Sequence, residues 1–279
     1  MNRTRITSIF HASDFSEASA TAFVHALKIA LVTEATLMML HVDPNYGADW
    51  SDFPGVRTTL ERWGLIPEGS PKSAVGSLGI DVTKVIATSS RPVKACLDFL
   101  SKHPAELIVL AIHQYEGNVR WLQKRVAEPV AHAAGQMTLF IPEGVPGFVS
   151  PDDGSISLHN ILIPVAKKPH AQPAVDAAVR MIHALQLPAG NVTLLHAGPA
   201  EEIPALQVAA DPGWNWKFKA RDGEPVEVIL QAATDASADL IVMTTEGPHG
   251  FLDALRGSTS TRVLRACRCP VLSLHVEPR

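Results

Sequence analysis

The chain contains one structural unit written twice, and this internal repeat constrains the fold more than any other feature of the sequence. The segment MMLHVDP at 38–44 matches TLLHAGP at 193–199, 155 positions later. Two further pairs lie 133 positions apart: ELIVL with DLIVM (106–110 and 239–243), and VAHAAGQMTLFI with VLRACRCPVLSL (130–141 and 263–274). The spacing falls by 22, so the second copy has a shorter middle segment.

A stretch rich in Gly, Pro, Ser and Asp, EGVPGFVSPDDGS at 143–155, separates the two copies. Such composition is typical of a connection between domains. At 279 residues the chain also has a suitable length for two domains. We therefore expect a first domain over residues 1–143, a linker over 144–156 and a second domain over 157–279.

Each copy alternates short apolar runs with helical patterns. In the first copy we predict a helix over 16–32, and the predicted strands are ITSIFHA (6–12), ATLMMLHV (35–42), DVTKVIA (81–87), ELIVLAI (106–112) and MTLFI (137–141). Nearly continuous apolar strands separated by helices indicate a parallel sheet that is covered on both faces. The predicted fold class is α/β, with two tandem doubly wound domains of five parallel strands each.

Composition excludes several classes of function. The net charge is −4 without a basic run, which argues against a nucleic-acid partner. No apolar stretch approaches the ~18 residues of a membrane span, and the N-terminal segment lacks the apolar core of a signal peptide. The three cysteines, Cys96, Cys267 and Cys269, are too few for a disulfide framework. We expect a cytoplasmic protein without a membrane or nucleic-acid partner.

The stretch TTEGPHGFLDALRGSTSTR at 244–262 follows the apolar run DLIVM and contains candidate phosphate-binding residues. Gly247 and Gly257 are separated by nine residues, and Ser258 and Thr259 open a predicted helix. Free N–H groups and the helix dipole favour an anion at such a position. No Lys precedes Ser258, so the stretch is not a Walker loop. The alternative is a glycine turn followed by a Ser/Thr helix cap, without a ligand.

Taken together, these segments resemble the universal stress protein family over nearly the whole chain. The resemblance depends on the order and spacing of SDFSEAS (13–19), the MLHV and LLHA segments, DLIVM, the G-x9-G-S-T pattern at 247–259, and CPVLSL (269–274). It implies an adenine nucleotide alpha hydrolase-like fold with strand order 3-2-1-4-5. It also implies that the two domains pair through their last strands.

The family motif is similar to G-x2-G-x9-G-[ST]-[VT]. In the second copy Gly247, Gly257, Ser258 and Thr259 match it, and Thr244 stands at its first glycine. A position that required positive φ would tolerate a β-branched residue poorly. The resemblance also implies that Pro164, Val165, Ala197 and Met243 line the base and ribose of a nucleotide.

The two copies depart from the family pattern in opposite ways. The aspartate that follows the first strand, and that faces adenosine in the family, is Asp14 in the first copy and Ala166 in the second. At the glycine positions the first copy has Ala111, Gln114 and Lys124, whose side chains would fill an anion pocket. We therefore interpret the Asp14 site as vestigial.

Three functional hypotheses follow. The first is a stress-response protein that binds ATP or another adenine nucleotide, with or without Mg²⁺, at the second domain. The second is a nucleotide-free interaction or scaffold protein in which both sites are degenerate. The third is a slow ATPase, although no G-x-S-x-G or H-E-x-x-H motif supplies a catalytic residue. The candidate associations are a homodimer and a protein partner that the sequence does not identify.

Two further features have competing interpretations. His11, His41 and His113 fall on strands or at strand ends near Asp14, which suggests either a zinc site or histidines that are hydrogen-bonded within the fold. The extra segment 44–90, with Trp50 and Trp63, suggests a lid, a partner-binding element, or an amphipathic helix packed on its own sheet. We favour the hydrogen-bonded histidines and the packed helix.

Overall fold

The computed structural model describes residues 6–45, 47–112, 126–208, 211–246 and 259–276. The strands of the first half are β1 (Ser8–Ser13), β2 (Thr36–Asp43), β3 (Asp81–Thr88), β4 (Leu107–Ile112) and β5 (Met137–Pro142). Those of the second half are β6 (Asn160–Pro164), β7 (Gly190–Ala197), β8 (Trp214–Arg221), β9 (Leu240–Glu246) and β10 (Val271–Val276). The helices are α1 (Glu17–Thr33), α2 (Val56–Arg62), α3 (Ser73–Gly76), α4 (Pro92–Lys102), α5 (Ala127–Ala134), α6 (Gln172–Ala184), α7 (Pro225–Asp235) and α9 (Thr259–Ala266), with short 3-10 turns η1 (Trp50–Asp52) and η3 (Ala200–Glu202).

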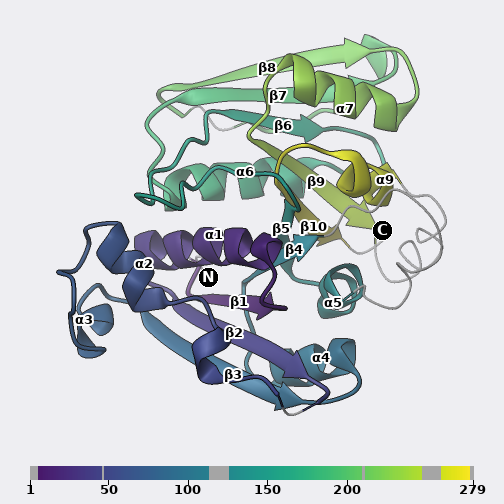
Figure 1. Ribbon diagram of the computed structural model, residues 1–279. Coiled ribbons are helices and arrows are strands. Elements are labelled where there is room, and N and C mark those ends of the chain that lie inside the picture. The colour runs from purple at the N-terminus through teal and green to yellow at the C-terminus, as the bar shows by residue number, and fades with distance from the viewer. Residues whose placement is uncertain (1–5, 46, 113–125, 209–210, 247–258, 277–279) are drawn as a thin grey trace.

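All these strands belong to one ten-stranded sheet, in the order β3-β2-β1-β4-β5-β10-β9-β6-β7-β8 (Figure 1). Pairing is parallel within each half, and the order 3-2-1-4-5 occurs twice, which confirms the predicted fold class. The halves join where β5 and β10 pair antiparallel. The last strands of the two copies therefore form the seam, as the resemblance implied.

The strand register confirms the internal repeat residue by residue. Ala111 of β4 pairs with Ile141 of β5, and Thr244 of β9 pairs with Leu274 of β10, so both partners shift by the same 133 positions. The structure thus places Thr244 where the first half has Ala111. Positions that the repeat aligns can therefore be compared directly.

Helices cover both faces of the sheet. On one face α1 and α6 pack against the sheet and against each other across the seam. On the other face α4 packs with α5, and α7 packs with α9. Helix α1 begins after Ser16, whose side chain accepts a hydrogen bond from the Ser19 N–H at 3.1 Å. Its apolar face, with Phe23 and Leu27, is buried, as the helical spacing predicted.

The extra segment of the first half packs on its own sheet. Helix α2 buries Val56 and Leu60 in the core, and Trp63 at its end is 8% exposed. The favoured interpretation, a packed amphipathic helix, is therefore the observed one. Trp63 has a second contact, because its indole Nε1 donates a hydrogen bond to the carbonyl of Pro151 at 3.1 Å.

That contact belongs to the segment between the halves, which is an ordered part of the structure. Phe148 is completely buried, and the Nε2 atom of His25 accepts hydrogen bonds from the amides of Phe148 (3.0 Å) and Val149 (3.2 Å). The other ring nitrogen of His25 donates to the carbonyl of Thr21 at 2.8 Å. The glycine-rich composition predicted the turns correctly, but the connection is fixed to the first half by α1 and Trp63.

Trp214 and Trp216 of β8 lie in or against the same core cluster, so both indoles share one face of the sheet as alternation predicts. No helix among the described residues is both long enough and apolar enough to cross a membrane.

Candidate functional site

The carboxyl ends of β6, β7 and β9 lie side by side, because these strands are parallel neighbours. In each half the strand order reverses between the first and fourth strands, here β6 and β9, and ligands of doubly wound sheets bind beyond such a reversal. Helix α9 begins at Thr259 and leads into β10, the neighbour of β9. The second strand-end site is defined here as residues 164–166, 197–198, 243–245 and Thr259.

The predicted site residues that the structure describes lie at or near the carboxyl ends of the neighbouring strands β6, β7 and β9 and at the start of α9. Pro164 and Ala197 are half-buried at the ends of β6 and β7. Val165 and Met243 are core residues at 3% and 5% exposure, on opposite faces of the sheet. Gly247, Gly257 and Ser258 lie outside the described residues.

Thr244 lies inside β9 and not in a turn. It is 7% exposed, pairs with Leu274 and is not among the residues with positive φ. A β-branched residue suits extended backbone. The anticipated strain at this position is therefore absent.

A histidine on the second strand ties each half's first two strands together. His41 Nδ1 donates to the carbonyl of Ser13 at 2.7 Å, and His196 Nδ1 donates to the carbonyl of Val165 at 3.0 Å. The matching MLHV and LLHA segments are the sequence signal for this pair. The bonds also confirm that Asp14, after Ser13, corresponds to Ala166, after Val165.

The environments of these two histidines differ. His41 is stacked against Phe15, with ring centroids 3.8 Å apart and planes 18° from parallel. In the second half Lys167 takes the place of Phe15 and is exposed. The Nε2 atom of His196 is buried and has no hydrogen-bond partner within the described chain. Gly198 lies close to this nitrogen, since a Cβ there would stand 3.0 Å from it.

In the first half, aromatic side chains from the extra segment extend this stack. Phe53 packs edge-on against Phe15 at 5.1 Å and is only 4% exposed. Trp50 in turn stacks on Phe53 at 6.2 Å and is 56% exposed. The series Trp50, Phe53, Phe15 and His41 therefore covers the ends of β1 and β2, an arrangement that no sequence motif indicated.

The charges at the strand ends also differ. In the first half Asp43 follows His41 closely and accepts hydrogen bonds from the amides of Asn45 (2.8 Å), Gly47 (2.5 Å) and Ala48 (2.7 Å). These backbone donors, that of Asn45 first, hold the pKa of the Asp43 carboxyl below its usual range. The protein's own carboxylate thus occupies the loop amides that an external anion would use.

The corresponding positions of the second half have no acid. Ala166 stands for Asp14, Gly198 stands for Asp43, and Lys167 and Lys168 follow Ala166 with exposed side chains. One carboxylate is near, because Glu202 of η3 lies 3.7 Å from the Lys167 ammonium group in a pair that is exposed on both sides. Such a pair is weak in water, so the lysines remain available to a bound anion.

Asp14 itself accepts hydrogen bonds from the backbone and hydroxyl of Ser16, at 3.0 and 2.5 Å, beside the start of α1. The carboxylate therefore orders the turn into this helix, whatever else it binds. Ser16 is the cap of α1, so the SDFS sequence has a structural role that does not require a ligand.

The histidines considered as zinc ligands have other partners. His11 is fully buried, and its Nδ1 lies 2.9 Å from the carbonyl of Val109. Burial lowers the pKa of His11 to about 4. His113 lies outside the described residues. Among the residues that are described, no group of three or more His, Cys, Asp or Glu side chains has a metal-binding arrangement.

The cysteines are buried thiols. Cys96, Cys267 and Cys269 are free, and burial raises the pKa of each to about 12. A thiol with so high a pKa is a poor nucleophile at neutral pH. Cys267 and Cys269 lead into β10 and pack in the core.

The two doubly wound halves, each with the strand order 3-2-1-4-5, define an α/β protein of the Rossmann-like class. The model of the universal stress protein family matches residues 6–142 and 199–275. The chain therefore belongs to the universal stress protein family.

Known relatives give the same picture. A universal stress protein of Methanocaldococcus jannaschii is 34% identical over 133 residues, which cover 44% of this chain and 78% of that protein. One of Thermus aquaticus is 48% identical over 50 residues, and this match covers 18% of the chain and 36% of the Thermus protein. Both matches thus concern only part of the chain.

Solved structures share the fold over almost the full length. The crystal structure of a universal stress protein from Archaeoglobus fulgidus has a TM-score of 0.63 at 15% identity and covers 98% of this chain and 97% of its own. A protein of Pseudomonas aeruginosa described as functionally unknown has a TM-score of 0.61, also at 15% identity, with 98% and 93% covered. At this identity the likeness concerns the fold alone.

Proposed function

We propose that this chain is a stress-response protein of the cytoplasm whose second half binds ATP or a related adenine nucleotide, chiefly through its phosphates. The first half is its structural partner, with residues 1–143 and 157–279 as the two domains. The observation that supports this most is the reversal of charge at the strand ends, from Asp14 and Asp43 to Ala166 and Gly198. The exposed Lys167 and Lys168 add positive charge on the same side.

The start of α9 supplies the second part of the argument. Helix N-termini attract anions through free N–H groups and the helix dipole, and the G-S-T sequence at 257–259 adds two hydroxyls. Arg262 of the same helix adds a further positive charge near its first turn, in an exposed ion pair with Glu224, the cap of α7, at 2.8 Å. The lysines and the helix start would then contact phosphates from two sides.

Recognition of the nucleoside should be weaker. The family aspartate that faces adenosine is Ala166, so a hydrogen bond worth ~0.5–1.5 kcal/mol is missing. The backbone groups of Val165 are already engaged, its N–H by Leu195 at 2.8 Å and its carbonyl by His196. We therefore infer that ATP and GTP bind within about tenfold of one another. Mg²⁺ would enter only with the polyphosphate.

A melting-temperature series with MgATP, MgGTP, MgADP and AMP tests this function. A nucleotide present at 100 times its Kd stabilises the folded protein by about 2.7 kcal/mol. Gly257→Val should abolish the shift, because it adds a branched side chain at the proposed phosphate contact. Lys124→Val, at the aligned position of the first half, should leave it unchanged.

Absence of any shift at millimolar MgATP would favour the second hypothesis, a scaffold without nucleotide. If Lys124→Val removed the shift in melting temperature and Gly257→Val kept it, the ligand would bind the first half and the proposal would be rejected. Phosphate release well above background would instead support the slow ATPase.

A further inference from the structure

We propose that the outer edge of β8 is a docking site for an extended acidic segment of a partner protein. Strand β8 is the last strand of the sheet, and within the described chain it pairs only with β7 (Figure 1). Residues 217–221 are all exposed. The outward N–H and C=O groups of such an edge accept another strand, a known mode of peptide recognition.

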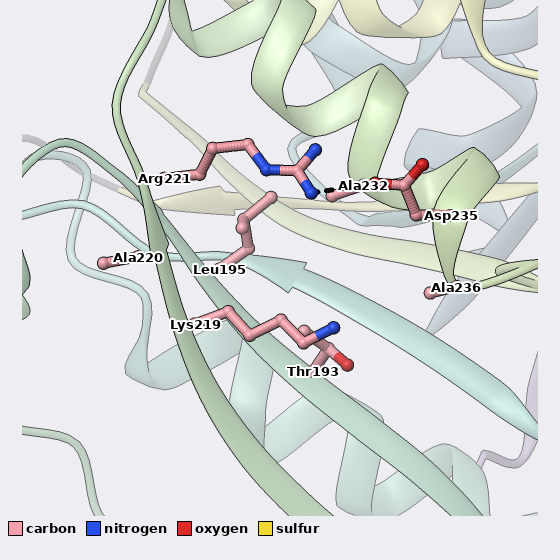
Figure 2. Close-up of a pocket in the computed structure, with 8 residues that line it drawn as sticks. All are labelled: Thr193, Leu195, Lys219, Ala220, Arg221, Ala232, Asp235 and Ala236. Carbon is pink, nitrogen blue, oxygen red and sulfur yellow. Dashed lines mark hydrogen bonds and ion pairs between the residues drawn. The ribbon is translucent and has the colours of Figure 1, made fainter.

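The two faces of this edge differ in chemistry. Lys217, Lys219 and Arg221 alternate along the strand and therefore share the face that α7 covers. Figure 2 shows Lys219 and Arg221 extending over this face towards Thr193 and α7, whereas Ala220 lies on the other side of the strand. Arg221 pairs with Asp235 at 2.8 Å. Within the described chain, neither Lys217 nor Lys219 forms an ion pair.

The opposite face presents an aromatic residue. Phe218 is 50% exposed in the middle of the strand, although its neighbours Trp214 and Trp216 belong to the core. An added strand places alternate side chains on the two faces. Carboxylates on one side would meet the lysines, and apolar groups on the other would contact Phe218.

The first half shows what covers the equivalent edge there. By register, Lys84 of β3 pairs with Met39, and Phe218 pairs with Leu194, its aligned counterpart. The Lys84 ammonium group donates to the carbonyl of Pro54 at 3.1 Å and lies over the Phe53 ring. The extra segment thus covers this position in the first half. The second half lacks 22 residues there, and Phe218 stands uncovered.

Edge lysines alone are a common defence against strand aggregation. That function does not account for an exposed phenylalanine between them. A second copy fits poorly, because antiparallel self-pairing about a two-fold axis would set the Lys and Arg side chains opposite one another. Nucleic acid fits poorly too, since three cations on a chain of net charge −4 form no basic tract.

The test uses two peptides, acetyl-(Glu-Val)4-amide and acetyl-(Lys-Val)4-amide, each with a neutral dye for fluorescence anisotropy. We expect the acidic peptide to bind at least tenfold more tightly, with affinity that falls as salt increases. Lys217→Glu with Lys219→Glu should reverse the preference. Phe218→Ser should weaken binding at least fivefold. Lys72→Glu with Lys102→Glu is the matched control, with the same change in net charge at two exposed lysines elsewhere.

Each variant is checked for an unchanged melting temperature. The proposal is overturned if both peptides bind equally well. It is also overturned if the control variant, Lys72→Glu with Lys102→Glu, changes peptide binding as much as Lys217→Glu with Lys219→Glu does. A dimer in sedimentation experiments that Phe218→Ser dissociates would assign the edge to a second copy. A single-stranded oligonucleotide that binds the same lysines more tightly than the acidic peptide would assign it to nucleic acid.

Discussion

The two halves share one topology and one register, yet their strand ends differ in nearly every respect. In the first half the aromatic rings of Phe15 and Phe53 cover the strand ends, and Asp43 occupies the neighbouring loop amides. In the second half the corresponding residues are Lys167, Gly198 and His196, whose Nε2 atom has no hydrogen-bond partner among the described residues. The fold therefore does not determine the site. A few residues after each strand decide whether the protein's own side chains occupy the space at the strand ends.

Acid should give the largest effect on stability, because the two fully buried histidines with a lowered pKa among the described residues both belong to the first half. Burial lowers the pKa of His11, near Asp14, and of His25 to about 4 from 6.5. The unfolded chain thus binds more protons between these values, and stability is lost as pH falls from about 6.5 to 4. Acidification through this range should cost about 3 kcal/mol of stability for each histidine. Urea unfolding at pH 7, 5 and 4 measures this loss.

His25→Gln sharpens the same test. The variant should lose stability at pH 7, since two amides lose their acceptor, but its pH dependence should be about half that of the native protein. A variant with the full pH dependence would show that the acid sensitivity arises elsewhere.

The next effect concerns the attachment of the connection to the first half. Gly147 and Gly144 both have positive φ (73° and 72°), but only at Gly147 would a Cβ meet a fixed group, the His25 Nε2 atom at 2.3 Å. Gly144→Ala should cost about 1 kcal/mol for the backbone alone. Gly147→Ala should cost about 3 kcal/mol or more because it also displaces His25. Chemical denaturation compares the two, and equal losses would mean that the connection is loosely held.

The charge difference between the halves predicts a smaller effect, on the affinity for MgATP. Lys167→Glu with Lys168→Glu should weaken MgATP about tenfold, since each exposed charge contributes on the order of 1 kcal/mol or less near a phosphate. Titration calorimetry provides the measurement. Lys72→Glu with Lys102→Glu, which alters the net charge equally, should have little effect on this affinity. An equal loss of affinity would show that the overall charge of the protein, and not the position of Lys167 and Lys168, is responsible.

The smallest effect should come from restoring the family aspartate. Ala166→Asp should tighten ATP roughly two- to tenfold by returning a hydrogen bond to the nucleoside. Inorganic tripolyphosphate, which has no nucleoside, should bind no better than before. If both ligands weaken alike, position 166 lies nearer the phosphates than the ribose.

Much of the fold was predictable because the repeat supplied its own alignment. The helix expected over 16–32 is Glu17–Thr33, and the strand expected over 81–87 is Asp81–Thr88. Strand order required the family resemblance, since hydrophobic patterns alone do not order a sheet. For the site, the sequence predicted which positions of the two halves correspond, but not the contacts that their side chains make.

What could not be predicted depends on contacts between residues far apart in the sequence. The bond from Phe148 to His25 spans 123 positions, and the edge-on contact of Phe53 with Phe15 joins the extra segment to a strand end. Neither leaves a periodic signal. Composition correctly indicated turns at Gly147 and Gly154 but gave no sign that Phe148 is buried. Thr244 shows a different kind of error. It stands where the family motif has a glycine, which suggested backbone strain, but β9 continues through this position in extended conformation.

The antiparallel seam between β5 and β10 makes the two halves permanent neighbours at a fixed ratio of one to one. In a dimer of identical subunits every mutation appears on both sides, so a loss at one site is a loss at both. Here the covalent connection and the shared sheet keep unlike halves together without any exchange of subunits. Each half was therefore free to diverge under its own selection, because a substitution in one half leaves the aligned position of the other unchanged.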